Sequence, residues 1–206
     1  MRGWTKDVTA SMLAAYDLRD GRLLKRIDAA PGVLNDLALL NDGRLFATDM
    51  GRHAVVTLAP DATALEVWAE ELAFPNGIAV SEDERFLYVA DFRGVTRFDL
   101  RDKARTAIES TRYIGGIDGL TVHRGALIGI QSAVGNPRVI RIDPTNGSVI
   151  VLESKNPLFE LPTTGVMAND GYYFIANPGL RSFAEDHTIW PAAKLREPIM
   201  LRLPID

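Results

Sequence analysis

The chain has 206 residues, of which 47% are hydrophobic and 24% charged, a composition that fits one globular domain with a substantial core. Its net charge of −4 provides no basic face, so nucleic acid is not an expected partner. Cysteine is absent, which excludes disulfides and thiolate metal sites. No apolar run approaches the roughly 18 residues that span a bilayer, so no membrane partner is expected. Residues 1–20 lack the order of a signal peptide, and the sequence indicates no compartment.

The first predicted element is a β-hairpin at residues 12–28. Two largely apolar runs, 12–18 and 23–27, flank Asp20-Gly21, a dipeptide typical of tight hairpin turns. No further pair of strands is apparent before this hairpin. We therefore expect residues 12–28 to form only the outer half of a larger sheet.

A motif then recurs four times along the chain. Each copy has a small polar residue, an apolar run, a turn, a second apolar run and a closing polar residue. The opening residues are 41, 42 and 46 positions apart, which is the period of one four-stranded propeller blade. We call Asn35, Asn76, Asp118 and Thr164 the opening residues, and Asp49, Asp91, Gln131 and Asn177 the closing residues.

The repeat predicts an all-β chain that folds as a β-propeller of the six-bladed type. Third strands are expected at 95–100, 139–144 and 199–203, and tight turns at 41–43, 82–84 and 169–171. A loop is expected at about 184–197. The whole chain, 1–206, is then one domain with the half-blade 12–28 and the blades 35–74, 75–116, 117–160 and 161–206.

This count gives about four and a half blades. Because ring closure removes exposed sheet edges from a propeller, we expect roughly one and a half further blades to precede this segment in a six-bladed ring. The alternative is a closed ring of five blades, in which residues 1–11 or a C-terminal strand complete the first blade.

The opening residues predict a functional site. The first strand of every blade lines the central channel, so the four opening side chains should converge at one mouth. Their carboxamide and carboxylate groups suit a hard cation. Turn or backbone-capping roles are the alternative for each, and above all for Thr164. The closing residues are expected to bond loop amides between blades.

These motifs resemble a known family. Leu34-Asn35-Asp36, Pro75-Asn76-Gly77-Ile78 and Asp118-Gly119-Leu120, in this order and one blade apart, are similar to the senescence marker protein (regucalcin), gluconolactonase and luciferin-regenerating enzyme family. The resemblance covers nearly all of the chain, and its C-terminal part looks like a bacterial subgroup. It implies a six-bladed propeller with one divalent cation, calcium or alternatively zinc, at the channel mouth.

The resemblance also implies roles for individual residues. Asn76 and Asp118 correspond to metal ligands, and Asn35 corresponds to a residue that contacts substrate or metal-bound water; we place Thr164 beside it. Asp118 is also the candidate catalytic base, as the one carboxylate among the opening residues. The family's first-blade glutamate ligand has no counterpart here, so weak metal binding is expected. Val33 stands where lactone-hydrolysing members have an arginine.

Two functions remain open from the sequence. The first is a metal-dependent hydrolase of a lactone or related small ester, with a small-molecule substrate. The second is a non-catalytic propeller that acts as a binding scaffold, or an inactive fragment, because the fold alone does not define activity. The sequence does not indicate an oligomeric state or any cofactor besides the cation.

Overall fold

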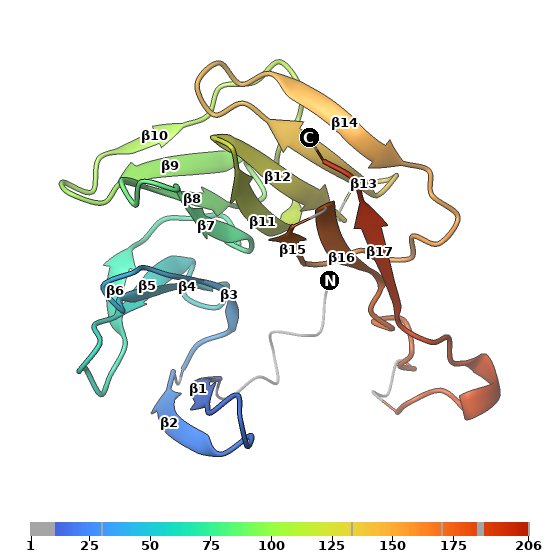
Figure 1. Ribbon diagram of the computed structural model, residues 1–206, viewed down its shortest axis with the longest axis horizontal. Helices are drawn as coiled ribbons and strands as arrows, with labels where there is room; N and C mark the ends of the chain where they lie inside the picture. Colours follow the sequence, from blue (N-terminus) through green and yellow to red (C-terminus); the bar gives the residue numbers. More distant parts are fainter. Residues whose placement is uncertain (1–10, 30, 133, 170, 185–187, 206) are drawn as a thin grey trace.

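The computed structural model describes residues 11–29, 31–132, 134–169, 171–184 and 188–205. Within them it contains strands and one short 3-10 helix, η1, in the order shown in Figure 1. The strands are β1 Met12–Tyr16, β2 Leu23–Asp28, β3 Leu34–Leu39, β4 Leu45–Asp49, β5 Ala54–Leu58, β6 Glu66–Ala69, β7 Ile78–Val80, β8 Phe86–Ala90, β9 Val95–Asp99, β10 Arg105–Ala107, β11 Ile117–His123, β12 Ala126–Gln131, β13 Arg138–Ile142, β14 Val149–Ser154, β15 Gly165–Ala168, β16 Gly171–Asn177 and β17 Ile199–Leu203.

The strands form antiparallel sheets that follow one another around an arc (Figure 1). β1 and β2 form a two-stranded hairpin. Then come three four-stranded sheets, β3–β6, β7–β10 and β11–β14, and a three-stranded sheet, β15–β17. The first strands contact each other in succession, β3 with β7, β7 with β11 and β11 with β15. The predicted all-β propeller is confirmed, with four blades in this arrangement and the hairpin beside the first.

The hydrophobic core lies between consecutive blades because the second strand of each blade is covered on both faces. Leu87 and Val89 on β8 are fully buried, and they pack with Phe46 of the preceding blade. Trp68 completes this layer with edge-to-face contacts to Phe46 and Phe98, at 5.1 and 5.3 Å between ring centroids. Two further clusters of the same kind join the second blade to the third and the third to the fourth.

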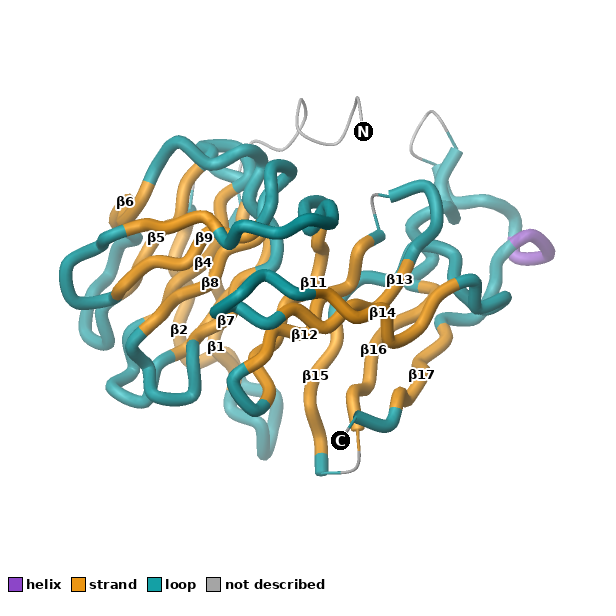
Figure 2. Tube along the Cα trace, turned by 90° about the horizontal axis from the view of Figure 1, so that it is seen from above, coloured by secondary structure: helices purple, strands orange, loops and turns teal. Residues whose placement is uncertain are grey.

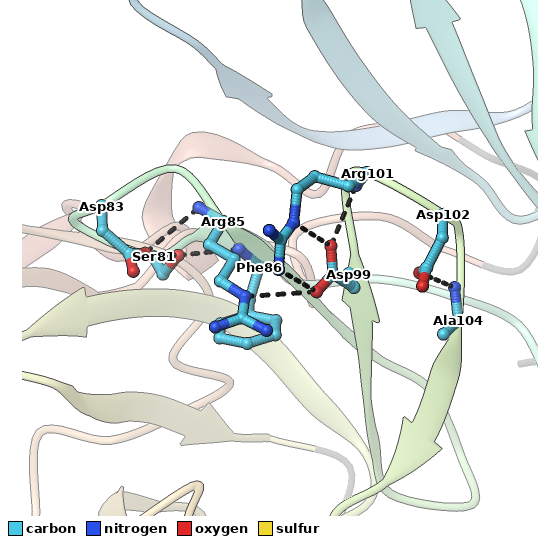
Figure 3. Close-up of polar contacts among 8 residues, drawn as sticks. All are labelled: Ser81, Asp83, Arg85, Phe86, Asp99, Arg101, Asp102 and Ala104. Carbon is cyan, nitrogen blue, oxygen red and sulfur yellow. Dashed lines mark hydrogen bonds and ion pairs between the residues drawn. The ribbon is translucent and has the colours of Figure 1, made fainter.

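The turns follow the local chemistry that the sequence indicates. Gly21, Gly43 and Gly147 have φ angles of 72°, 86° and 71°, a region that favours glycine, and each amide closes its turn with a backbone hydrogen bond. In the second blade, Asp83 accepts hydrogen bonds from the Ser81 hydroxyl and the Arg85 amide in place of a glycine turn (Figure 3).

The next turn of the second blade is organised by Asp99. The backbone amide and side chain of Arg101 donate to its carboxylate, and Arg85 adds a further bond (Figure 3). These hydrogen bonds lower the pKa of Asp99 to about 2.

The last blade differs from the others by its long connection. β17 pairs with β16 as the predicted third strand, with Phe174 opposite Leu201. Of the loop expected at 184–197, residues 185–187 lie outside the described residues. Ile189 in this loop forms an isolated bridge with Phe183, which precedes it. The short helix η1, Ala192–Lys194, follows (Figure 2). The turn expected at 169–171 includes residue 170, which is also outside them. Across the described part of the chain, no helix is long and apolar enough to cross a membrane.

The closing residues are buried and bond the loops around them, as expected. Asp49 accepts the backbone amides of Val33, Gly51 and Arg52 through one oxygen. Gln131 instead donates to two carbonyl oxygens, those of Tyr113 and Gly115. In both cases one partner lies in the loop that leads into the first strand of the same blade.

Asp91 makes the corresponding contacts in the second blade. Its carboxylate accepts the amide of Ala73 at 2.8 Å, in the loop before Asn76, and the amides of Arg93 and Gly94 at 2.7 and 3.1 Å. Only 4% of Asp91 is exposed, so water does not replace these bonds. The side chain thus fastens the loop that precedes an opening residue.

Replacing Asp91 should therefore destabilise the blade. Asp91→Ala leaves three backbone amides without their acceptor, and we expect the free energy of unfolding to fall by about 3 kcal/mol. Urea denaturation followed by tryptophan fluorescence measures this loss.

The matched control is Asp102→Ala in the same blade. Asp102 accepts one amide, that of Ala104, in an exposed turn (Figure 3), and its loss should cost less than about 1 kcal/mol. Equal losses in the two variants would contradict the fastening role of Asp91.

Candidate functional site

The opening residues stand at one end of the blades, beside the closing residues. In β3, Leu34 lies opposite Asp49 and Leu37 lies opposite Ala47, so the first strand has one extra residue between these pairs. β11 has the same irregularity between Ile117 and Leu120. Such bulges re-aim side chains and occur next to functional sites. Here they contain Asn35-Asp36 and Asp118-Gly119.

Asn76 and Asp118 are brought together by adjacent blades. The Asn76 side chain hydrogen-bonds to the Asp118 carboxylate, and the Ser132 hydroxyl donates to the same carboxylate at 3.2 Å. The amide oxygen of Asn76, Oδ1, is buried and has no hydrogen-bond partner. A buried carbonyl oxygen without a partner is costly, so this atom is a point where a ligand or cation would be favoured.

The environment of Asp118 alters its proton affinity. Burial raises the pKa of Asp118 above its ordinary value, although hydrogen bonds from Ser132 and Asn76 act in the opposite direction. A carboxylate with a raised pKa is a stronger base. Asp118 therefore combines a partly buried position with the ability to take up a proton.

Asn35 and Thr164 are placed differently. Asn35 is exposed, and its side-chain amide donates to the sulfur of Met50 at 2.9 Å. Thr164 is also exposed. In the second blade, the backbone amide of Asn76 donates to the carbonyl oxygen of Ala90 on the second strand. In the last blade, the amide that makes this bond is that of Thr163, which donates to the Ile175 carbonyl oxygen. The hydrogen-bond register thus aligns Thr163 with Asn76, and Thr164 stands one residue further on.

Asp36 belongs to the site but was not among the sequence-based candidates. Burial raises its pKa to about 6, and the charge of Asp118 contributes to the rise, while the Ile78 and Leu37 amides donate to its carboxylate and oppose it. A signal for it exists in the repeat, since the residue after the opening residue is glycine in the other blades and aspartate here. The residues at this position are Asp36, Gly77, Gly119 and Gly165.

Tyr172 is a second buried group near these acids. Its side chain is fully buried on β16, and burial raises the pKa of its phenol well above the ordinary value, with the charge of Asp36 adding to the rise and the nearby Thr121 hydroxyl opposing it. Gly165 makes room for the ring, because a Cβ at this glycine would lie 2.6 Å from the Tyr172 ring. No feature of the repeat singles out Tyr172.

The donor set is small for a metal site. Among the described residues, no three His, Cys, Asp or Glu side chains are grouped to hold an ion. Asn76 Oδ1 and the Asp118 carboxylate are the two candidate oxygen donors. The Asp36 carboxylate already accepts two backbone amides, those of Leu37 and Ile78. These residues fit two positions of a calcium or zinc shell, and hard oxygen donors of this kind suit calcium.

The architecture defines the class as a β-propeller, in which Asn76 and Asp118 of adjacent blades form the candidate site. Residues 7–166, more than half of the chain, match the family described as "SMP-30/Gluconolactonase/LRE-like region", and the chain belongs to this family. The resemblance seen in the motifs is therefore confirmed. Comparison with curated proteins gave no match.

Solved structures with the same fold include three enzymes. A gluconolactonase from Xanthomonas campestris has a TM-score of 0.60 and 23% identity over 78% of this chain and 60% of its own. A luciferin-regenerating enzyme has a TM-score of 0.60 and 16% identity, with coverage of 88% and 67%. A streptogramin B lyase has a TM-score of 0.65 and 14% identity, with coverage of 97% and 64%. At these identities the likeness shows the fold alone.

The pKa of Asp36 makes a prediction for stability. Its value in the folded chain is about 6, above the ordinary 3.8, so the folded state holds this proton more tightly than the unfolded state. The contribution of Asp36 is fully present below pH 3.8 and is lost as the pH rises through 6. The loss amounts to about 3 kcal/mol at most.

The comparison of the chain with Asp36→Asn isolates this contribution, because asparagine does not titrate and can still accept the Ile78 amide. From pH 4 to pH 7, we expect the unfolding free energy of the original chain to fall relative to that of Asp36→Asn. Urea denaturation in the presence of a chelator measures it. Parallel pH profiles would show that Asp36 titrates normally.

Proposed function

We propose that this protein is a metal-dependent hydrolase of a lactone or a related small ester. The observation that carries the proposal is the buried Asn76 Oδ1, which has no hydrogen-bond partner, beside the partly buried Asp118 carboxylate in a propeller of this family. The likeness to a gluconolactonase supports the same class of hydrolase.

In this proposal Asn76 and Asp118 hold one divalent cation, calcium or alternatively zinc. When bound, such an ion polarises a carbonyl group and lowers the pKa of a coordinated water. In this proposal Asp118, the one carboxylate of the pair, accepts the proton of the attacking water. Ser132 orients the carboxylate through its hydrogen bond at 3.2 Å.

The described residues favour weak binding of the ion. Calcium takes six to eight oxygen ligands, often from several carboxylates, and this site offers Asp118 and Asn76. Asn35, exposed at the start of β3, and Thr164, exposed at the start of the last blade, are proposed to contact substrate or water.

Val33 bears on the substrate. The resemblance places a sugar-acid-binding arginine at this position, whereas Val33 is apolar and packs close to Gly51, where a Cβ would lie 3.1 Å from the valine side chain. We therefore propose a neutral, small lactone or ester in preference to a sugar lactone.

We also propose that the complete ring has six blades. The chain spans 60–67% of the length of the three structures compared above. Large apolar side chains are exposed on both outermost faces of the arc: Leu37 and Leu39 on β3 are 50% and 60% exposed, and Val166 and Met200 on the last blade are 62% and 67% exposed. Within the arc, by contrast, the faces between consecutive blades are buried against each other.

Metal binding tests the proposed function. The chain should bind calcium or zinc in a calorimetric titration, and Asp118→Ala should reduce this binding below detection, because it removes the one carboxylate ligand. Asp102→Ala, a change of the same size in an exposed turn, should bind as the original chain does.

A lactone hydrolysis assay on the metal-loaded proteins should show the same order of activity. Equal affinity in the chain and in Asp118→Ala would remove the site. If the unsubstituted chain bound no ion and hydrolysed no lactone, a binding scaffold would become the better description of this propeller.

A further inference from the structure

The first blade forms hydrogen bonds to the segment that contains Asn76 and leads into β7 of the second blade. The Thr48 hydroxyl, on β4, donates to the backbone carbonyl oxygen of Asn76 at 2.7 Å. The Asp36 carboxylate, on β3, accepts the Ile78 amide at 3.1 Å. Thr48 is fully buried, so both bonds lie within the interface of the two blades.

The direction of the Thr48 hydrogen bond is defined by its neighbours. The hydroxyl oxygen accepts the Asp36 amide at 3.0 Å, and its single proton has two carbonyl oxygens within reach. Asn76 is the nearer at 2.7 Å, against 3.3 Å for Asp36. The proton is therefore given to Asn76, which links Asp36, Thr48 and Asn76 in one chain of bonds.

Among the four described blades, this arrangement is specific to the first. The residues that correspond to Thr48 in the strand register are Ala90, Ile130 and Ile175, whose side chains carry no hydrogen-bonding group. The residues that correspond to Asp36 are Gly77, Gly119 and, in the register of the last blade, Thr164. The two glycines touch the next blade directly: a Cβ at Gly77 would lie 2.8 Å from the Asp118 carbonyl oxygen, and one at Gly119 would lie 2.6 Å from the Thr164 Cα. Between the third and fourth blades the Thr121 hydroxyl, further along β11, donates to the Gly165 carbonyl oxygen at 3.4 Å. Among the interfaces between the described blades, only the one between the first and second has polar side chains at the positions of both Asp36 and Thr48.

Asn76 is consequently held from both sides. Its own amide donates to Ala90 within its blade at 2.9 Å, and its carbonyl oxygen receives the Thr48 proton from the preceding blade. Its side-chain amide bonds Asp118 and leaves Oδ1 without a partner. A backbone fixed in this way presents Oδ1 in one orientation.

We propose that Thr48 and Asp36 are positioning residues that orient Asn76 Oδ1 for the ligand of the site. For its metal readout, this inference rests on the proposed function. Groups behind a ligand that orient it commonly change metal affinity by 10–100-fold. Thr48 is the sharper test, because its hydroxyl bonds the backbone carbonyl of Asn76 and is not one of the proposed ligands.

The experiment compares Thr48→Val, Thr48→Ser and a matched control, Thr57→Val. Thr57 lies on β5 of the same blade and donates its hydroxyl to Leu45 at 3.0 Å, within its own sheet. Both valine variants keep the shape of threonine. Thr57→Val loses one hydroxyl bond, and Thr48→Val loses the bond to Asn76 together with the one that its hydroxyl accepts from the Asp36 amide. Thr57→Val therefore controls for the loss of a partly buried sheet hydroxyl that does not bond Asn76. The serine variant keeps the hydroxyl.

Calorimetric titration with calcium and with zinc is the first readout. Thr48→Val should bind about tenfold more weakly than the original chain, whereas Thr48→Ser and Thr57→Val should stay within about twofold. If Thr48→Val bound the ion as tightly as Thr57→Val, the positioning role would be overturned.

The second readout needs no metal. In 15N-labelled protein, the side-chain amide protons of Asn76 should exchange with solvent at least about tenfold faster in Thr48→Val than in Thr57→Val, with rescue in Thr48→Ser. If the original chain bound neither ion, the proposed function would fail and this exchange would decide the positioning role alone. Equal exchange in the two valine variants would overturn it.

Discussion

The structure depends on one hydrogen bond that recurs in the first three blades. It joins a buried polar side chain at the end of the second strand to the loop that leads into the first strand of the same blade. Asp49, Asp91 and Gln131 each capture this loop a few residues before the opening residue. Buried backbone groups must find partners, and a loop that crosses from one blade to the next has no strand to supply them. The closing residues supply them, so the positions of Asn35, Asn76 and Asp118 follow from theirs.

The last blade shows what happens when this bond is made elsewhere. Asn177 donates to the Glu197 carbonyl, in the long connection before β17, and accepts the Gly179 amide. β16 also has an irregularity between Ile175 and Asn177. In this blade the hydrogen-bond register aligns Thr163, not Thr164, with Asn76. Spacing in the sequence could not reveal a shift of one residue that is produced by a bulge in the neighbouring strand.

Most of the fold was predictable because its signals are local. The 41- and 42-residue spacings, the Asp-Gly and Asn-Gly turns and the polar closing residues are each read within one blade. The pairing of Asn76 with Asp118 followed from radial repetition. The roles of Thr48 and Tyr172 did not, because each depends on a partner in another blade, and nothing in their own neighbourhoods differs from that of a core residue. Asp36 is intermediate in this respect. The repeat shows an aspartate where glycine follows the other opening residues, but the hydrogen bond to the Ile78 amide of the second blade, which explains why a carboxylate fits there, is visible only in the structure.

The glycines after the opening residues have a consequence for how such a propeller can diversify. At Gly77 and Gly119 the neighbouring strand leaves no space for a side chain, so any larger residue would wedge the blades apart. Larger side chains at these two positions are therefore excluded by the neighbouring blade. Asp36 stands at the same position of the first blade and accepts the Ile78 amide of the second, so a side chain is accommodated here where the facing backbone supplies a hydrogen-bond donor.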